Sequence, residues 1–259
     1  MAHPNFLLNS RTLIIGGSSG LGFAVASGAL SSGSKVHITS LTAQKLSDKI
    51  AQLQSLYPGA HVSGSNADLS SPETLEGNLR SILDSAVMKT GGPLDHIVYT
   101  AGDFPTRTPL GEITAETALA SFTVRYLGSL LVGKLVAANP GRYLNPASSS
   151  SITLTSGLTA HRPPPGWSTA APVIAAVEAL SRTLAVDLAP IRVNVVIPGA
   201  VHTELLDRLT GGKSEMFKAS TLTKEVGTPE GAAEAYLFCM RSALATGQGF
   251  IVDNGSLMV

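Results

Sequence analysis

The sequence is poor in cysteine and in charge, and each shortage excludes a class of site or partner. The chain of 259 residues has a single cysteine, Cys239, so it can form neither an intramolecular disulfide nor a multi-cysteine metal site, which suits a reducing compartment. The six histidines show no H-x-x-x-H or comparable spacing, so we expect no metal site. Charged residues make up 14% of the chain, the 18 basic and 18 acidic residues cancel, and no basic cluster occurs. Nucleic acid and anionic membrane are therefore not expected partners.

Long hydrophobic runs and a secretory signal are also missing from the sequence. The first ten residues have neither a basic region nor a long apolar core, as a signal peptide would. No apolar run approaches the roughly 18 residues that a bilayer span needs. We therefore expect a soluble, cytoplasmic protein without a membrane contact.

Apolar material, by contrast, is plentiful. Hydrophobic residues make up 44% of the chain, enough to cover a sheet on both faces and to bury a subunit interface. The length is compatible with one undivided α/β domain, and no linker rich in proline, glycine or serine divides the chain. The sequence therefore predicts a single domain over residues 1–259.

Short runs rich in β-branched residues alternate with stretches of helical spacing. The runs predict strands at 12–15, 36–39, 96–99, 152–155, 193–197 and 250–252, with a weaker strand near 60–62. The stretches between them predict helices at about 20–32, 42–56, 71–89, 114–138, 168–188 and 229–241. Apolar strands separated by helices are typical of a parallel sheet with right-handed crossovers. We predict an α/β fold of three layers, a doubly wound parallel sheet of about seven strands with helices on both faces.

A glycine-rich turn follows the first predicted strand, with the sequence Gly16-Gly17-Ser18-Ser19-Gly20-Leu21-Gly22. Glycines at this place let backbone N–H groups approach a pyrophosphate and put the anion at the positive end of the next helix. The spacing is G-x-x-x-G-x-G, which by itself is also compatible with a plain tight turn. Its position between the first strand and the first helix favours dinucleotide binding.

The turn and four later segments, in the same order, resemble the motifs of the short-chain dehydrogenase/reductase (SDR) family. The turn resembles T-G-x-x-x-G-x-G, with Ile15 in place of the threonine. The later segments are Ala67-Asp68-Leu69, Tyr99-Thr100-Ala101-Gly102 in place of N-N-A-G, the P-G-x-x-x-T segment Pro198 to Thr203, and the closing residues 246–255. The resemblance implies a Rossmann-like fold that binds a dinucleotide. It implies cofactor contacts from Gly16, Ser18, Ser19, Gly20, Leu21, Gly22, Asp68, Ala101, Gly102, Pro198, Gly199, Val201 and Thr203.

The choice of cofactor depends on the end of the second strand. An acidic residue there would bind the 2′-hydroxyl of NAD and repel a 2′-phosphate. The sequence has Ser40-Leu41-Thr42 instead, which favours NADP(H), with Lys45 or Arg11 as charge partners of the phosphate. The alternative is that Ser40 and Thr42 only cap the following helix.

The catalytic region departs from the family. The resemblance implies a serine, a tyrosine and a lysine four residues after the tyrosine, but the register set by residues 177–185 places Ile174 at the lysine and Ala170 at the tyrosine. A common spacing places Gly157 at the serine, and a shift of one residue restores Ser156. Arg125 stands where the family has an asparagine. We therefore expect that the standard proton-transfer residues are gone.

The segment that replaces them is Arg162-Pro163-Pro164-Pro165-Gly166-Trp167. With the arginine for asparagine, it resembles a divergent fungal group of the family that includes reductase/Diels–Alderases of secondary metabolism. That group is associated with P-D-P-G-W, and Pro164 stands at the place of the aspartate, so the resemblance does not carry over this acid.

Four residues are candidates for the chemistry, and three of them have a structural alternative. Arg125 could anchor a substrate carbonyl or carboxylate, or it could pair within the fold. Trp167 could cover a planar substrate, or it could anchor a core or an interface. His161 could serve as an acid or base, or be solvated. Ser156 could polarise the substrate carbonyl. Asp103 and His202 also lie beside the expected cleft, and Tyr99 and Tyr126 are expected to be packed.

Residues 203–226 fall where the family carries its mobile substrate flap. Their apolar side chains, among them Leu205, Met216 and Leu222, suggest an apolar and bulky small-molecule substrate. The helices at 114–138 and 170–188 correspond to the usual interface helices, so the resemblance implies a homodimer or homotetramer.

Together these features predict a noncanonical NADP(H)-dependent oxidoreductase. It would transfer hydride to an apolar iminium or carbonyl substrate without the Ser-Tyr-Lys triad. An iminium suits this loss because it becomes a neutral amine without an acid, whereas a reduced ketone needs a positioned proton donor. The alternatives are a redox-neutral isomerase or cyclase on the same scaffold and a catalytically inactive nucleotide-binding regulator.

Overall fold

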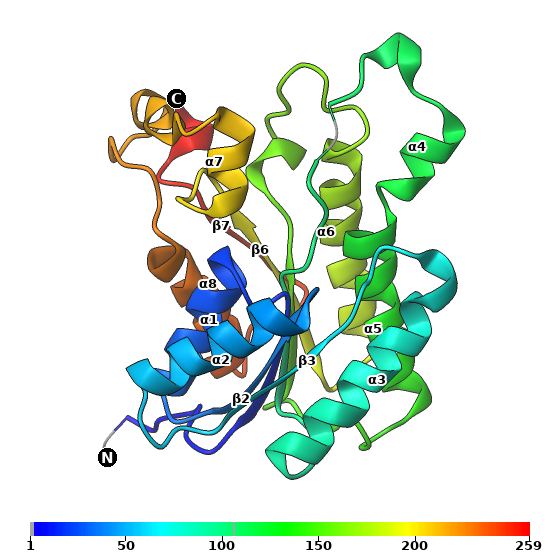
Figure 1. Cartoon of the computed structure of the whole chain (residues 1–259), viewed down its shortest axis with the longest axis vertical. Helices are drawn as coiled ribbons and strands as arrows, with labels where there is room; N and C mark the ends of the chain where they lie inside the picture. Colours follow the sequence, from blue (N-terminus) through cyan, green and yellow to red (C-terminus); the bar gives the residue numbers. More distant parts are fainter. Residues whose placement is uncertain (1–2, 106) are drawn as a thin grey trace.

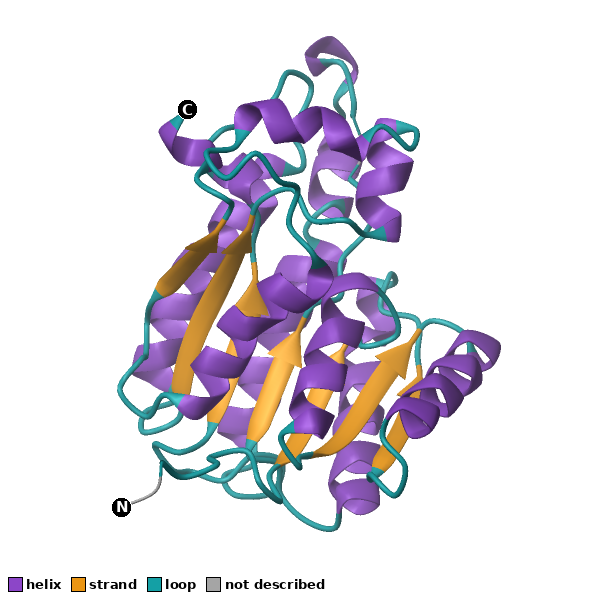
Figure 2. Cartoon of the chain, turned by 90° about the vertical axis from the view of Figure 1, so that its left-hand side faces the viewer, coloured by secondary structure: helices purple, strands orange, loops and turns teal. Residues whose placement is uncertain are grey.

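A computed structural model describes residues 3–105 and 107–259, and the chain forms one seven-stranded parallel sheet. The strands are β1 (Arg11–Ile15), β2 (Lys35–Ser40), β3 (Val62–Asn66), β4 (His96–Tyr99), β5 (Ser151–Thr155), β6 (Arg192–Pro198) and β7 (Gly249–Val252). Their order in the sheet is β3-β2-β1-β4-β5-β6-β7. All arrows point to the same edge, and helical segments lie beyond it (Figure 2). The predicted doubly wound α/β fold is confirmed.

Helices cover both faces of the sheet and make three layers (Figure 1). The helix α1 (Gly20–Ser31) packs on α8 (Pro229–Arg241), and α2 (Ala43–Leu56) lies on the same face. The opposite face carries α3 (Pro72–Thr90), α5 (Gly128–Ala138) and α6 (Ala171–Asp187). All seven residues of β6 are buried, as expected for a strand covered on both faces.

Each face of the sheet has its own apolar core. Leu75, Leu79, Ile82 and Leu83 of α3 are at most 1% exposed and pack on one face. Leucine, isoleucine and valine side chains of this kind contribute roughly 1.5–3 kcal/mol each when fully buried. This burial, rather than any one contact, fixes the strands whose ends form the site.

Two of the predicted elements are corrected by the structure. The third strand runs from Val62 to Asn66 instead of lying near 60–62, because its polar, small residues pair with β2 in register. The predicted helix at 114–138 is divided into α4 (Ala115–Ala120), a π-helical turn η2 (Thr123–Leu127) and α5. Helical spacing in a sequence gives no sign of such a turn, because the apolar pattern continues across it.

The same segment corrects the expectation about apolar runs. Residues 115–138 are long and apolar enough, with a mean hydropathy of 1.3, to pass a test for a membrane span. Buried core helices pass this test too, and α5 packs against α3 and α6.

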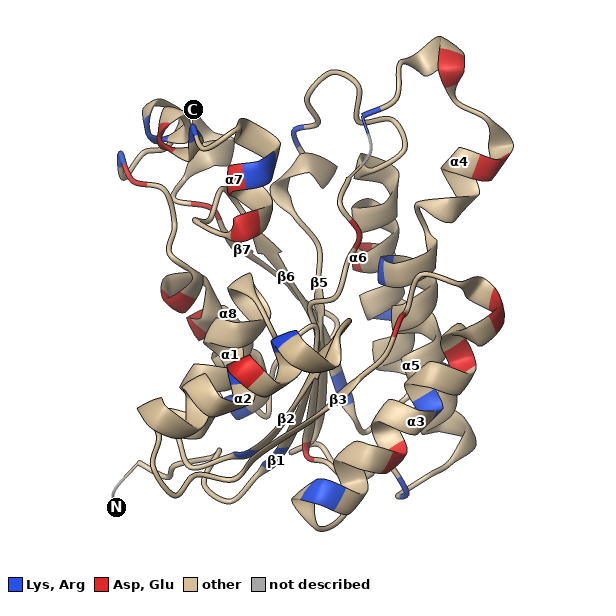
Figure 3. Cartoon of the chain, viewed as in Figure 1, with Lys and Arg blue, Asp and Glu red and all other residues tan. Residues whose placement is uncertain are grey.

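Short helical pieces lie beyond the carboxyl ends of the strands. They are η1 (Leu110–Glu112), η3 (Leu158–Ala160), α7 (Glu204–Thr210), η4 (Ser214–Ser220) and η5 (Ser256–Met258). Basic and acidic residues are interspersed over the face shown in Figure 3 and form no basic patch there.

Candidate functional site

The candidate site lies at the carboxyl ends of the strands, where the order of the sheet reverses. From β1 the chain proceeds to β2 and β3 on one side, and then returns to β4 on the other side of β1. Ligands of doubly wound sheets bind in the crevice that such a switch point opens. The glycine-rich turn after β1 and the residues after β4 meet at this point.

The glycine turn forms a cradle that side chains would fill. Gly16 has φ of +90°, and a Cβ there would lie 2.6 Å from the Ala101 nitrogen. A Cβ on Gly22 would collide with the Gly16 carbonyl oxygen, and one on Gly20 would lie 3.1 Å from Thr203 Cγ2. The fold therefore brings together segments that are more than eighty residues apart in the sequence, as the family motif implied.

The two serines of the turn lie at the start of α1. Ser18 is buried, and Ser19 is the N-cap residue, although its side chain makes no capping hydrogen bond. The first turn of α1 holds no acidic residue, so nothing neutralises its positive end. With Leu21 partly buried just behind, the turn has the backbone donors and the charge that a pyrophosphate requires.

The surroundings of the end of β2 are consistent with the predicted role of Ser40 in binding NADP(H), but they exclude the predicted role of Arg11. The Ser40 hydroxyl oxygen is buried and has no hydrogen-bond partner among the described residues. Thr42 caps α2, because its side chain accepts from the Lys45 nitrogen at 3.3 Å. Lys45 Nζ lies 3.3 Å from the Glu204 carboxylate of α7, across the crevice. Arg11 was a wrong candidate, since it begins β1 at the opposite edge and donates to the Pro93 carbonyl at 3.3 Å.

Asp68 follows β3 and stays exposed at the same edge as Ser40. Its carboxylate accepts from the Ser70 backbone N–H at 2.9 Å, and hydrogen bonds from Ser70 hold the pKa of Asp68 below its ordinary value. The Asp68 carbonyl accepts from Asn78 Nδ2 at 2.7 Å, which fixes the loop. The side chain is therefore ionised and held at the edge where an adenine would lie.

The residues after β6 close the other end of the crevice. Pro198 ends the strand, and a Cβ on Gly199 would lie 2.7 Å from Asp253 Cα, so only glycine allows this approach. Thr203 donates to the Val201 carbonyl at 3.2 Å and accepts from the Leu206 nitrogen at 3.2 Å as the cap of α7.

His202, in the same segment, is bound by two residues of η4. Its ring nitrogens lie 3.2 Å from the Ser214 hydroxyl and 3.2 Å from the Glu215 carboxylate, both in η4. His202 therefore ties residues 214–215 to the segment after β6.

By the register predicted from the sequence, Ala170 and Ile174 stand at the positions of the family tyrosine and lysine, and neither side chain is ionisable. Ala170 is the N-cap residue of α6, and Ile174 follows one turn later. A Cβ on Gly157 would lie 3.5 Å from Ile174 Cδ1, so these two positions face each other at the end of β5. The helix begins at Ala171, three residues later than predicted, because the preceding residues form a separate turn.

Arg125 is placed by the π-helical turn η2. In this turn some backbone carbonyls lie outside the usual helical hydrogen-bond pattern, and side chains bind them. The Tyr99 hydroxyl donates to the Val124 carbonyl at 2.6 Å, and the Ser129 hydroxyl donates to the Arg125 carbonyl at 2.6 Å. The buried Tyr99 hydroxyl therefore fixes the turn from β4, which agrees with the expectation of a packed side chain. Single π-helical turns are frequent at functional sites.

The Arg125 guanidinium crosses the floor of the crevice. Its Nη1 donates to the Thr155 carbonyl at the end of β5, at 3.2 Å. It also lies flat against Gly102, where a Cβ would be 2.5 Å from the arginine Cζ. Burial lowers the pKa of Arg125 below its ordinary value, but an arginine remains charged at neutral pH. A partly buried cation with one backbone acceptor thus lies beside the residues that follow β4 and β5.

Trp167 carries an unpaired polar atom in the segment that replaces the tyrosine. Its indole Nε1 is buried and has no hydrogen-bond partner in the described part of the chain. The Arg107 guanidinium lies 5.9 Å from the centre of the ring. Residues 163–168 and 171–172 line a cavity of about 420 Å³. An N–H donor beside such a cavity can bind an acceptor atom of a ligand.

Ser156 and His161 meet through a residue that the sequence did not indicate. The Ser156 hydroxyl lies 2.6 Å from Glu178 Oε1, and His161 Nε2 lies 3.1 Å from the same oxygen. The available signal was its position, because Glu178 follows Ile174 by one helical turn and shares its face.

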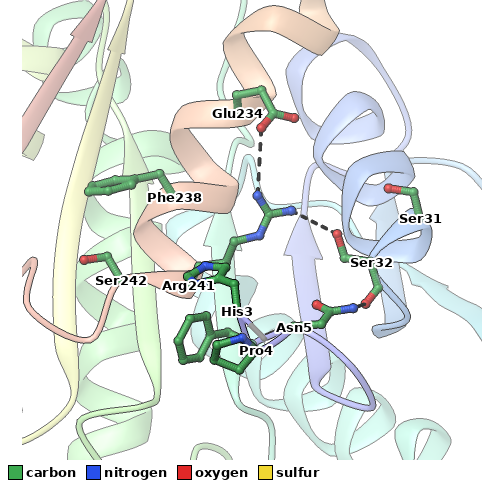
Figure 4. A pocket seen from close by; sticks show the side chains of 10 residues that line it. His3, Pro4, Asn5, Ser31, Ser32, Glu234, Phe238, Arg241 and Ser242 are labelled. Carbon is green, nitrogen blue, oxygen red and sulfur yellow. Dashed lines mark hydrogen bonds and ion pairs between the residues drawn. The ribbon is translucent and has the colours of Figure 1, made fainter. Parts of the chain in front are cut away.

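Another groove lies at the opposite end of the molecule. Residues 3–6, the end of α1 and the end of α8 line a cavity of about 740 Å³ (Figure 4). Its one arginine, Arg241, already donates to the Ser32 hydroxyl at 3.0 Å and pairs with Glu234 at 3.9 Å. The groove shares no residue with the cofactor cradle. Among the described residues, no group of three or more His, Cys, Asp or Glu side chains could hold a metal ion.

Three features define a class of protein. They are the glycine cradle at the switch point, the loops that follow the strands, and the order of the strands in the sheet. The model of an SDR-like Rossmann domain matches residues 3–259, so the chain belongs to the short-chain dehydrogenase/reductase family of oxidoreductases.

Several fungal members of the family are similar over nearly the whole chain. A short-chain dehydrogenase/reductase, ATR9, of Stachybotrys chlorohalonatus is 39% identical, with 93% of this chain and 94% of that protein covered. The protein ucsE of Acremonium sp is 37% identical over 95% of this chain and 94% of its own length.

Solved structures agree with this assignment. The MalC reductase/Diels-Alderase of Malbranchea aurantiaca has a TM-score of 0.92 and 35% identity, and the match covers 98% of this chain and 99% of that one. A short-chain dehydrogenase of Burkholderia cenocepacia, solved in complex with NADP, has a TM-score of 0.83 and 25% identity over 97% and 99% of the chains.

Proposed function

We propose that this enzyme is a noncanonical NADP(H)-dependent reductase of an apolar iminium or carbonyl compound. The observation that carries the proposal is the combination of an intact dinucleotide cradle with Ala170 and Ile174 at the places of the tyrosine and the lysine. Side chains at positions 16, 20 and 22 would fill the cradle, and their absence is expected only if the protein still binds a nucleotide. The similarity to proteins described as reductases supports the same conclusion.

The residues present fit NADP(H). The backbone of residues 16–22 and the start of α1 would hold the pyrophosphate, and Asp68 with Ala101 would lie beside the adenosine. Gly102, Pro198, Gly199, Val201 and Thr203 would surround the nicotinamide. When bound, the cofactor supplies a hydride for reduction. The relative from Burkholderia cenocepacia, whose structure contains NADP, supports this fit.

The preference for the phosphorylated cofactor rests on the end of β2. The buried Ser40 hydroxyl, without a partner among the described residues, offers a donor to a ribose substituent, and residues 40–42 include no carboxylate. Lys45, in the first turn of α2, lies 3.3 Å from Glu204, and both side chains are exposed. Once Lys45 leaves Glu204, it offers a positive charge to the phosphate. Both features favour a 2′-phosphate over a free hydroxyl.

Replacing Ser40 by aspartate should therefore reverse the preference. We expect the wild-type protein to bind NADPH at least about tenfold more tightly than NADH, and Ser40→Asp to weaken NADPH by roughly 10²-fold, because two like charges would meet at close range. Fluorescence titration through Trp167, checked by calorimetry, measures both constants. The matched control is Ser81→Asp on the exposed face of α3, which should leave both unchanged. Equal affinity of the wild type for the two nucleotides would contradict this assignment.

The proposed substrate lies between Arg125 and Trp167. Arg125 can hold a carbonyl or carboxylate of the substrate, and the unpaired Nε1 of Trp167 can donate to another acceptor. Phe104 and Leu205 are about 40% exposed near this region, and Arg208 of α7 lies 4.5 Å from the Phe104 ring centre. We propose that residues 203–226 form the flap of the substrate site and that the apolar side chains on it receive a bulky substrate.

A redox-neutral isomerase or cyclase is the second candidate. The specific observation in its favour is the structural similarity to a protein described as a reductase/Diels-Alderase. Consumption of NADPH with substrate, followed by absorbance, separates the two functions. Conversion of a substrate without a net change of NADPH would support the cyclase, and binding of nucleotide without any conversion would support an inactive regulator.

We also propose that the protein is a single-domain, cytoplasmic homo-oligomer. Ala175 and Ala179 of α6 are exposed on the outer face, where small residues allow close approach of a second helix. Size-exclusion chromatography with light scattering measures the number of subunits.

A further inference from the structure

The hydrogen-bonded group of Ser156, Glu178 and His161 begins at the end of β5 and ends in solvent. Ser156 directly follows β5, it is 4% exposed, and its backbone N–H donates to the Val196 carbonyl at 2.9 Å. Glu178, on α6, has a side chain only 13% exposed, and the His161 side chain is 36% exposed. The three residues therefore form a continuous polar path from the end of the sheet to the surface.

Each contact of this path has the length that proton transfer needs. The separation of 2.6 Å between Ser156 Oγ and Glu178 Oε1 is that of a short hydrogen bond to a carboxyl group. The Ser156 hydroxyl also lies 3.1 Å from the Ile174 carbonyl, so it keeps an acceptor when Glu178 carries the proton. His161 Nε2, at 3.1 Å from Glu178, completes the path.

The loop that carries His161 is anchored on its far side. Arg162 donates to the Ser256 carbonyl at 3.0 Å and to the Val259 carbonyl at 2.7 Å, both in the C-terminal turn. The His161 backbone N–H donates to the Leu158 carbonyl at 2.9 Å. These contacts fix the loop, and the loop holds His161 next to Glu178.

We propose that Ser156, Glu178 and His161 form a proton relay that replaces the missing tyrosine and lysine, and that the natural substrate is a carbonyl compound. The inference rests on the proposed reductase function. It assigns Glu178 as a new functional residue and selects the carbonyl over the iminium, because an iminium needs no proton after it accepts hydride.

The step balances in atoms and charge. Hydride from NADPH, the reductant, forms a C–H bond at the carbonyl carbon, and the π electrons of the C=O bond move to oxygen. That oxygen takes the Ser156 proton, Ser156 takes a proton from Glu178, and Glu178 takes one from the His161 imidazolium. Water restores the proton on His161, so one hydride and one proton convert the ketone into an alcohol.

Other charges near the relay must be considered in any pH dependence. The remaining ionisable groups on α6 and on the elements packed against it are Arg125, Tyr126, Lys134, Arg182, Asp187 and Arg192. None of the six makes a hydrogen bond or ion pair with Glu178 or His161 in the described part of the chain. Arg125 donates to the Thr155 carbonyl, one residue before Ser156.

Two probes test the relay, a bicyclic ketone (decalone) and the N-methyl dihydroisoquinolinium cation, each with NADPH. We expect Glu178→Gln and His161→Phe to lower kcat for the ketone by roughly 10²-fold, the usual size of a general-acid contribution, and to leave reduction of the cation unchanged. Glu116→Gln, on the exposed face of α4, is the matched control and should change neither reaction.

The outcomes are distinct. If both variants reduce the ketone like the wild type, or slow both probes equally, the relay is wrong and the cluster is structural. If the wild type binds no NADPH or reduces neither probe, the proposed function fails. The relay is then judged by NMR of the free protein: a slowly exchanging His161 Nε2–H signal that Glu178→Ala removes supports the path, and its absence in the wild type overturns it.

Discussion

Replacing Arg125 by lysine should lower kcat/KM for the substrate that undergoes reduction by roughly 10²-fold, with NADPH binding unchanged. The guanidinium lies against Gly102 and donates to the Thr155 carbonyl at 3.2 Å, so it presents its remaining N–H groups in a fixed plane. Lysine keeps the charge but loses this planar geometry and one arm of the contact. A lost donor at a developing negative charge typically costs about 10²–10³ in rate. Steady-state kinetics and nucleotide titration measure the two effects separately.

Two further variants define the role of Arg125. Arg80→Lys, on the surface of α3 and paired with Glu76, is the matched control and should have wild-type kinetics. Gly102→Ala leaves the arginine in the sequence but displaces it, because the new Cβ would lie 2.5 Å from Arg125 Cζ. It should lose activity like Arg125→Lys. Wild-type activity in Arg125→Lys would show that this side chain is purely structural.

Acid should destabilise the fold through two buried histidines. Burial, with smaller contributions from Lys89 and His61, lowers the pKa of His37 to about 4, and burial with Arg192 lowers the pKa of His96 to about 3. Both folded-state values lie below the value of about 6.5 in an unfolded chain. The stabilising effect is therefore complete above pH 6.5 and is lost as the pH falls towards the folded-state values. At pH 4.5 the loss is about 5 kcal/mol for the two together.

Denaturant unfolding at pH 8 and pH 4.5 measures this loss. His37 lies between the Ser63 and Ser65 hydroxyls, at 2.9 and 3.1 Å, and His96 lies 2.9 Å from the Ser151 hydroxyl. Asparagine at both positions keeps a polar partner but cannot be protonated, so the double variant should lose much less stability on acidification. His3→Asn, in the exposed N-terminal segment, is the control. An unchanged pH dependence in the double variant would show that other groups dominate.

The order and type of the elements could be predicted from the sequence because they depend on local patterns. The alternation of apolar strands with helices predicted the layers, and the turn from Gly16 to Gly22 predicted the cofactor edge. The resemblance to the family, through the register of residues 177–185, also predicted that the tyrosine and the lysine are absent. The weak third strand was misplaced because its residues are small and polar, and only pairing with β2 selects them.

The arrangement of the candidate site depended on contacts between distant segments. The π-helical turn that aims Arg125 is held by Tyr99, 25 residues earlier in the chain, and no local spacing indicates it. Arg11 was a plausible phosphate partner in the sequence, but the direction of β1 places it at the wrong edge. Glu178 was visible as one residue of a helix, and only the packing of α6 on β5 joins it to Ser156 and His161. The sequence alone thus determined the class of fold and the family, because these follow from periodicity and motifs. Only the tertiary structure decided which side chains meet, because that depends on how the helices pack over the ends of the strands.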